Sequence, residues 1–144
     1  MGIYFENFSE QNFMLAVLHD SVTDDDLDAH ITRLLKPEYD QPGKTGLCVV
    51  CKNASTKKLS SRALISAGKR MKQATFRQKG KLAIVSNTTV GFGLAKIYQI
   101  ATEVAGLDET RVLRGNELDT AMQWIGVSDF SSEVKHKVDQ LESE

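Results

Sequence analysis

The stretch of this sequence best suited to holding a ligand is the run NTTVGFGLAK. It follows the apolar run LAIVS and opens a helical pattern, so Gly91 and Gly93 stand at a strand-to-helix junction. Glycines there can cradle an anion against the free N–H groups of the helix. A dinucleotide fingerprint needs a third small residue, and Lys96 stands in its place. We therefore predict a site for a small apolar or anionic ligand, or for a protein partner, formed by Asn87, Thr88, Thr89, Gly91, Phe92, Gly93 and Lys96.

The alternative is that both glycines serve the backbone only. They would then supply a positive φ at the turn and a close approach of the helix to the strand.

Cys48 and Cys51 form a CxxC pair, which is typical of a redox or zinc element. Leu47, Val49 and Val50 around them are strand formers, and a strand points alternate side chains to opposite faces. The two thiols then cannot share a metal ion or a disulfide. We predict two buried small side chains, no metal site and no cofactor.

A set of catalytic residues is not recognisable. His19 lies at the end of an apolar run, and the neighbouring Asp20 could orient it, but no nucleophile stands in a recognisable context. The sequence therefore predicts a protein that is not an enzyme.

The charges are unevenly distributed, although the net charge is −1. No Asp or Glu occurs from Gln41 to Thr102, so the middle of the chain is basic and both ends are acidic. This pattern supports an alternative function, an anion-binding module that contacts nucleic acid or an anionic membrane. Nucleic acid is the less favoured partner, because neither interleaved aromatic residues nor a known motif accompanies the charges. The basic patch comprises Lys69, Arg70, Lys72, Arg77 and Lys79.

Two further interpretations of the basic patch remain open. It could be an ordinary solvated helix face. It could also pair with the acidic ends of a second copy, which predicts a homo-oligomer.

Strand and helix patterns alternate along the chain. Thr23 and Asp26 have the spacing of a capping box, Pro37 ends the helix that follows, and Asn116 is expected to cap a later helix. The polar run NASTKKLSS is expected to be a loop. Apolar runs predict strands at 3–6, 13–18, 47–51, 81–86 and 111–114, and helical spacing predicts a second helix at 61–77 and a third one after residue 93 that Gly106 ends.

This order predicts an α/β fold with a five-stranded, mostly parallel sheet, an N-terminal β-hairpin and helices on both faces. Residues 1–127 would form one domain and residues 128–144 a peripheral helix. No run of about 18 apolar residues and no basic leader is present, so we expect a cytoplasmic protein without a transmembrane segment.

The segments KGKLAIVSNTTVGFGLAKIYQIATE and TRVLRGNELDTAMQWIG resemble the SpoIIAA-like, STAS-related bacterial proteins. The matching features are Gly93-Leu94-Ala95-Lys96 at a helix start, the short strand Val112-Leu113-Arg114, and a helix from Leu118 to Ile125 with Trp124. The helix start from Val22 to Leu27 is also similar, and the resemblance covers residues 13–127. It implies a SpoIIAA-like fold without an established catalytic centre, whose relatives act as protein-interaction switches and whose fold neighbours hold lipids.

The resemblance also points to Ser60 and Ser61 as phospho-acceptors, because the switch proteins are phosphorylated on a serine at the start of the second helix. The flanking Asp and Gly of that motif are absent here. The alternative is that one of these serines caps the helix. Taken together, the sequence predicts a regulatory interaction or ligand-binding module.

Overall fold

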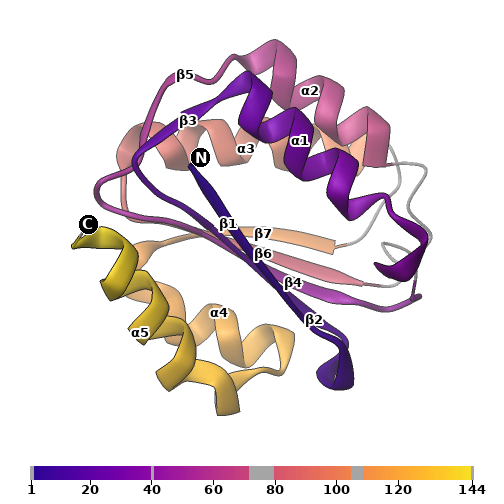
Figure 1. The fold of residues 1–144 in the computed structure, drawn as a ribbon, viewed down its shortest axis with the longest axis vertical. Helices are drawn as coiled ribbons and strands as arrows, with labels where there is room; N and C mark the ends of the chain where they lie inside the picture. The colour runs from indigo at the N-terminus through magenta and orange to yellow at the C-terminus, as the bar shows by residue number, and fades with distance from the viewer. Residues whose placement is uncertain (1, 40, 72–79, 105–108, 144) are drawn as a thin grey trace.

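A five-stranded sheet runs through the middle of the fold (Figure 1). The structure is a computed structural model, and it describes residues 2–39, 41–71, 80–104 and 109–143. The strands lie in the order β1-β2-β4-β6-β7. Their bounds are β1 Ile3–Phe8, β2 Phe13–Leu18, β4 Thr45–Val50, β6 Lys81–Ser86 and β7 Glu109–Arg114.

The α/β class and the N-terminal hairpin are confirmed. β1 pairs antiparallel to β2, whereas β2, β4, β6 and β7 pair parallel to one another. The sheet is therefore mixed, where a mostly parallel sheet was expected, because the hairpin adds its first strand at one edge. The continuously apolar runs of β2 and β6 are buried along nearly their whole length, as expected of strands covered on both faces.

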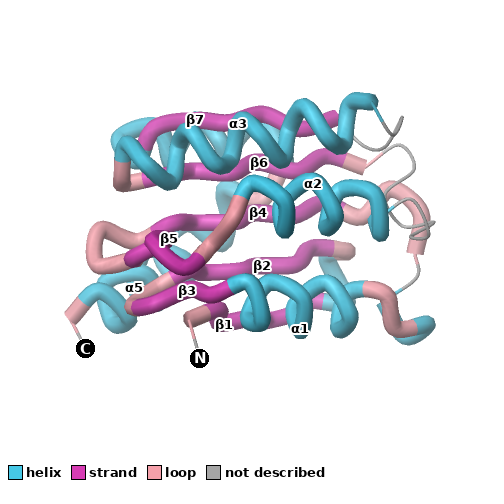
Figure 2. The backbone as a smooth tube through the Cα atoms, turned by 90° about the horizontal axis from the view of Figure 1, so that it is seen from above, coloured by secondary structure: helices cyan, strands magenta, loops and turns pink. Residues whose placement is uncertain are grey.

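Helices cover both faces of the sheet (Figures 1 and 2). The chain moves one strand sideways at each parallel crossover, always in the same direction. Right-handed crossovers then place the three connecting helices on one face. These are α1 Asp24–Leu34, α2 Ser61–Arg70 and α3 Thr89–Val104, while α4 Leu118–Ile125 and α5 Ser131–Glu142 cover the other face.

The start of α1 confirms the capping box. The Asp26 N–H donates to Thr23 Oγ1 at 3.1 Å, and the Thr23 N–H donates to the Asp26 carboxylate at 3.0 Å. This hydrogen bond from the Thr23 N–H lowers the pKa of Asp26. The helix ends at Leu34, ahead of Pro37, as expected.

A second, two-stranded sheet corrects the prediction of a loop after β4. β3 Ser21–Thr23 and β5 Ser55–Lys58 pair in parallel, and the Ser55 N–H donates to the Asp20 carbonyl at 2.6 Å. β3 follows the carboxyl end of β2, and β5 follows the carboxyl end of the adjacent strand β4, so both segments lie at the same end of the main sheet. Their polar residues carry little strand signal, so tertiary proximity creates this pairing.

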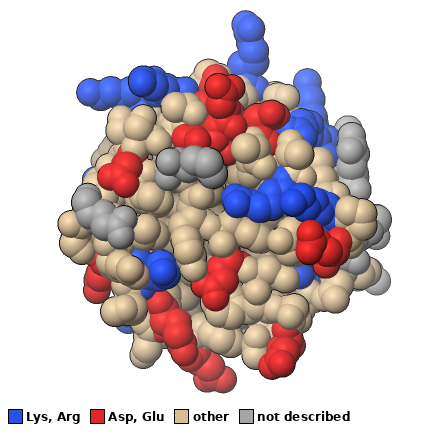
Figure 3. Space-filling model, viewed as in Figure 1, with Lys and Arg blue, Asp and Glu red and all other residues tan. Residues whose placement is uncertain are grey.

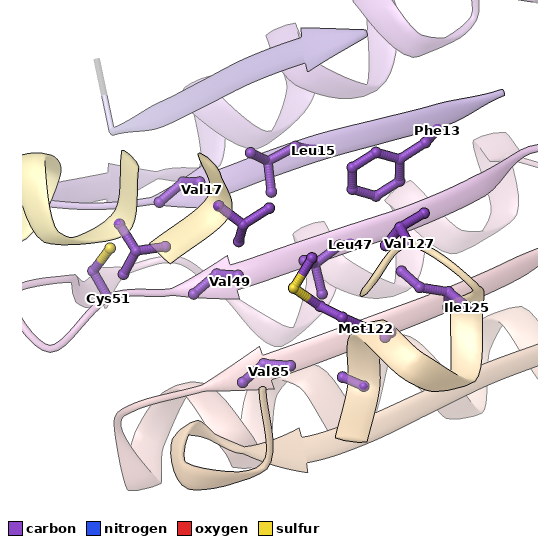
Figure 4. Close-up of a cluster of buried hydrophobic side chains, with 14 of the residues drawn as sticks. Phe13, Leu15, Val17, Leu47, Val49, Cys51, Val85, Met122, Ile125 and Val127 are labelled. Carbon is purple, nitrogen blue, oxygen red and sulfur yellow. The ribbon is translucent and has the colours of Figure 1, made fainter. Parts of the chain in front are cut away.

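The core between the sheet and the pair α4 and α5 is closely packed (Figure 4). Alternate residues of β2, β4 and β6 point into it, including Phe13, Leu47 and Val85. Met122 of α4 is fully buried against them. The helix expected to be peripheral, α5, contributes three buried side chains to this core: Val134, Val138 and Leu141.

Several helix boundaries differ from the sequence prediction or fall outside the described residues. α3 was expected to begin after residue 93 but begins at Thr89, so Gly91 and Gly93 lie in its first two turns. Asn116 lies within a 3-10 turn, Gly115–Glu117, that precedes α4, so it does not cap that helix. The described part of α2 ends at Arg70, where a helix to residue 77 was expected. Residues 72–79, with Lys72, Arg77 and Lys79, and the proposed Gly106 cap lie outside the described residues.

None of the described helices combines the length and the apolar character that crossing a membrane would require.

Candidate functional site

An apolar cavity of about 120 Å³ lies between the sheet and the helices α1, α2 and α3. Its floor is formed by side chains of β1, β2, β4 and β6, and each of the three helices contributes to the roof. The roof includes Leu27 and Ile31 of α1, Leu64 of α2, and Leu94 and Tyr98 of α3. The cavity therefore sits at the centre of the layer that connects the parallel strands.

Small residues at the centre of the sheet explain why this space is not filled. Ala16 of β2 faces Cys48 of β4, and the next row of the same face pairs Met14 with Gly46. These three small residues, Ala16, Gly46 and Cys48, all line the cavity. Helices pack on a sheet at a distance set by the larger side chains around the rim, so a floor of small residues leaves a void beneath them.

The lining favours a neutral, apolar occupant. Burial raises the pKa of the Cys48 thiol to about 12, so the thiol is protonated at neutral pH. His30 lines the cavity and lies edge-on to Phe5, with the ring centroids 5.7 Å apart. A charged group in this lining would lose its hydration without an equivalent replacement, which is costly.

The predicted turn contributes to the cavity through a single residue of its set, Gly91. A Cβ at Gly91 would lie 2.6 Å from the Ser86 hydroxyl and 3.1 Å from a methyl group of Val50. Glycine at position 91 therefore permits the close approach of α3 to the strands, which was one of the two backbone roles considered for these glycines. The positive φ is not present, because the positive-φ glycines of the described chain are Gly43 and Gly126.

Polar groups of the turn bind one another. The Gly91 N–H donates to Thr88 Oγ1 at 3.0 Å, which caps α3, and the Phe92 N–H donates to the Thr88 carbonyl at 3.0 Å. Asn87 Nδ2 donates to the Val50 carbonyl at 3.1 Å. With these N–H groups occupied, the helix start is a weaker anion site than the sequence indicated.

The remaining residues of the predicted ligand set lie away from the cavity. Phe92 is flanked by the Arg114 guanidinium, 3.9 Å from its ring centroid, and by the Lys96 ammonium at 5.5 Å. Thr89 and Gly93 are exposed, and a Cβ at Gly93 would meet no described part of the chain beyond its own stretch of helix within 4 Å. The predicted set therefore divides between the cavity wall and the outer surface.

Ser60 occupies the capping position of α2. Its hydroxyl accepts from the Ala63 N–H at 3.1 Å and donates to the Asp24 carboxylate at 2.9 Å, while the Ser60 N–H donates to the same carboxylate at 2.7 Å. A phosphate on Ser60 would stand against Asp24, and like charges would repel. Ser61 is exposed in the first turn of α2. Phosphorylation of either serine stays a prediction.

The basic patch is partly neutralised by the neighbouring helix. Arg70 is paired with Asp28 of α1 and donates to Thr32 Oγ1 at 2.9 Å, whereas Lys69 is exposed. Acidic α1 therefore lies beside basic α2. On the face in Figure 3, acidic and basic side chains are interspersed over these helices. This arrangement weakens the case for an anion-binding surface on α2.

The other candidate residues are the two cysteines, predicted to be buried, and His19; Cys51 is buried, whereas Cys48 is half-buried. Cys48 lines the cavity, whereas Cys51 belongs to the core on the opposite face, so the two thiols do point to opposite sides. His19 Nδ1 lies 2.7 Å from the Asp20 carboxylate, as expected. Within the described ranges, no cluster of His, Cys, Asp and Glu has an arrangement that could hold a metal ion.

In comparisons with known proteins, no family model matches this chain, and no significant match to a curated protein or to a solved structure was found. The resemblance to SpoIIAA-like proteins therefore stays a prediction.

The cavity is the feature that sequence reasoning missed. A signal for it was present, because Ala16, Gly46 and Cys48 interrupt strands that are otherwise rich in large apolar residues. Only the register of β2 and β4 shows that the three fall on one face and next to one another.

Proposed function

We propose that this protein is a non-enzymatic, STAS-like module that binds a small neutral apolar molecule in the cavity beneath α1, α2 and α3. The observation that carries the proposal is the cavity itself, about 120 Å³ of apolar space, partly open to solvent, between the sheet and these three helices. An engineered cavity of about 150 Å³ with a comparable lining stays dry and binds benzene or xenon. A ligand of that size is therefore the appropriate expectation.

Ligand binding here would act on several elements together. The occupant would contact the sheet floor and all three helices of one layer, including the start of α3 at Gly91. A ligand that binds only the folded state stabilises it in proportion to its occupancy. Tightening of these helices against the sheet would give the module two states that differ in surface rigidity, which suits a cytoplasmic regulatory protein.

The test is a titration of the protein with benzene, followed by ¹⁵N-edited NMR, together with xenon binding followed by ¹²⁹Xe NMR. We expect the largest amide shifts at cavity residues such as Ala16, Gly46 and Gly91, and little change in α4 and α5. Unshifted cavity amides at benzene saturation would refute the proposal.

Two cysteine variants provide the matched comparison. Cys48→Leu places a larger side chain in the cavity and should abolish both signals. Cys51→Val changes a buried cysteine on the opposite face of the sheet and should leave them intact. Equal loss of binding in the two variants would show that the ligand does not occupy the cavity.

A further inference from the structure

The outward face of α3 carries apolar side chains that no described part of the chain covers. Val90 is 67% exposed and Ile100 is 61% exposed, and Ile97 beside them is half-buried. Together with the open position at Gly93, these residues follow helical spacing and form one stripe. Figure 2 shows α3 as the outermost of the described helices in its layer, with α2 on one side and none of the described helices on the other. An exposed apolar stripe of this kind marks an interaction surface.

Two opposite charges flank the stripe on one side. Lys96 and Glu103 are both exposed and are separated by about two helical turns, so they lie on the same flank. The Lys96 ammonium lies 5.5 Å from the Phe92 ring, towards the side where Arg114 of β7 lies. The face therefore combines an apolar centre with one positive and one negative charge along its edge.

We propose that this face of α3 binds a second copy of the same chain, with the two α3 helices packed antiparallel. A twofold axis between Lys96 and Glu103 passes close to Ile100. Lys96 of each copy then faces Glu103 of the other, and the two Ile100 side chains meet near the axis. Such an isologous contact forms each ion pair twice, which is the arrangement that a self-complementary face permits.

The charge pattern favours a second copy over a membrane. Membrane-surface helices surround their apolar face with Lys and Arg, whereas the stripe on α3 is flanked by one basic and one acidic residue. One helix face provides less than the roughly 800 Å² per partner of a standard interface. The dimer should therefore be weak, with a dissociation constant in the micromolar range or above.

The dimer face is separate from the cavity. Gly91, Ala95 and Tyr98 of α3 line the cavity on the inner side of the helix, and the stripe lies on the outer side. Substitutions on the stripe should therefore leave benzene binding unchanged.

The first test is sedimentation equilibrium of the full chain over a range of concentrations up to millimolar, at low salt. The wild type should show a reversible monomer–dimer equilibrium. Ile100→Lys should weaken dimerisation by about tenfold or more. The control Lys57→Glu alters an exposed charge on β5 and should leave the monomer–dimer equilibrium unchanged. A monomer at every concentration, or a dimer indifferent to Ile100→Lys, would overturn the proposal.

The second test uses charge reversal. Lys96→Glu and Glu103→Lys should each weaken the dimer, because both leave like charges facing each other, and the double variant should restore it. Failure of the double variant to restore dimerisation would overturn the antiparallel arrangement. Binding of a monomeric protein to anionic vesicles through the same stripe would assign the face to a membrane and would also overturn the proposal.

Discussion

Cys48 and Cys51 should respond in opposite directions to one substitution. Both are free cysteines, Cys48 within β4 and Cys51 directly after it, but Cys48 borders the cavity while Cys51 is fully buried in the opposite core. Part of the Cys48 surface is free of packing contacts because it faces the empty volume. We therefore expect Cys48→Leu to be tolerated or stabilising and Cys51→Leu to be destabilising.

The expected magnitudes follow from the two environments. A Leu at position 48 adds about two methylene-sized groups to an apolar space, a gain of at most about 1.5 kcal/mol. Loss of rotamer freedom removes about 0.5 to 1 kcal/mol of this gain. The same side chain at position 51 enters a filled core, where overpacking costs about 1 to 3 kcal/mol. The two variants should therefore differ by about 1.5 to 4 kcal/mol in the free energy of unfolding.

Urea denaturation followed by circular dichroism measures this difference, and unchanged m-values would confirm that the comparison is between similar transitions. In a thermal scan the melting temperatures should differ by at least about 3 °C. If Cys48→Leu lowers the free energy of unfolding as much as Cys51→Leu does, the space beside Cys48 cannot accept a side chain. The reasoning about the cavity would then be wrong.

Three other predictions concern the capping box, the thiols and the glycines. Thr23→Ala should cost about 1 kcal/mol of unfolding free energy through loss of the cap. Because the Thr23 N–H lowers the folded-state pKa of Asp26 below the ordinary value of 3.8, the stability from that carboxylate is complete above this value and is lost as the pH falls through the lowered pKa. Urea midpoints of the wild type should therefore decline on acidification below about pH 4, and an Asp26→Asn variant should remove part of that decline. Burial raises the pKa of both Cys48 and Cys51 to about 12, so neither should react with iodoacetamide at pH 8 until the protein unfolds, and rapid native-state alkylation seen by mass spectrometry would contradict this. Gly115→Ala should destabilise by about 1 to 3 kcal/mol, because its Cβ would overlap the Asn87 side-chain oxygen, whereas Gly93→Ala in the open part of α3 should stabilise by about 0.5 to 1 kcal/mol in the same denaturation assay.

The sequence alone was sufficient for the features that depend on neighbouring residues. The order of the helices and of the five strands of the main sheet followed from local apolar patterns, because each pattern matches the geometry of one element. The capping box of Thr23 and Asp26 was predictable because both of its hydrogen bonds lie within one turn. The opposite orientation of Cys48 and Cys51 followed from strand alternation.

Features that join distant segments were not predictable in the same way. The pairing of β3 with β5 depends on β2 and β4 being adjacent, and neither short strand has an apolar pattern of its own. The burial of α5 depends on its packing beside α4 against the same face of the sheet, which the sequence of α5 does not specify. Arg70 looked like part of an anion-binding patch until the packing of α1 placed Asp28 beside it.

The candidate site illustrates the same division. The sequence showed that Gly91 and Gly93 follow β6 closely, but it predicted a helix after residue 93, whereas α3 begins at Thr89 and includes both glycines. Which side of the junction between β6 and α3 could hold a ligand was decided by tertiary packing. Hydrogen bonds among Ser86, Thr88 and Gly91 occupy the polar groups of the turn, whereas the register of β2 and β4 gathers Ala16, Gly46 and Cys48 beneath the helices. A cavity is a property of all the side chains around it, so no local pattern can specify it.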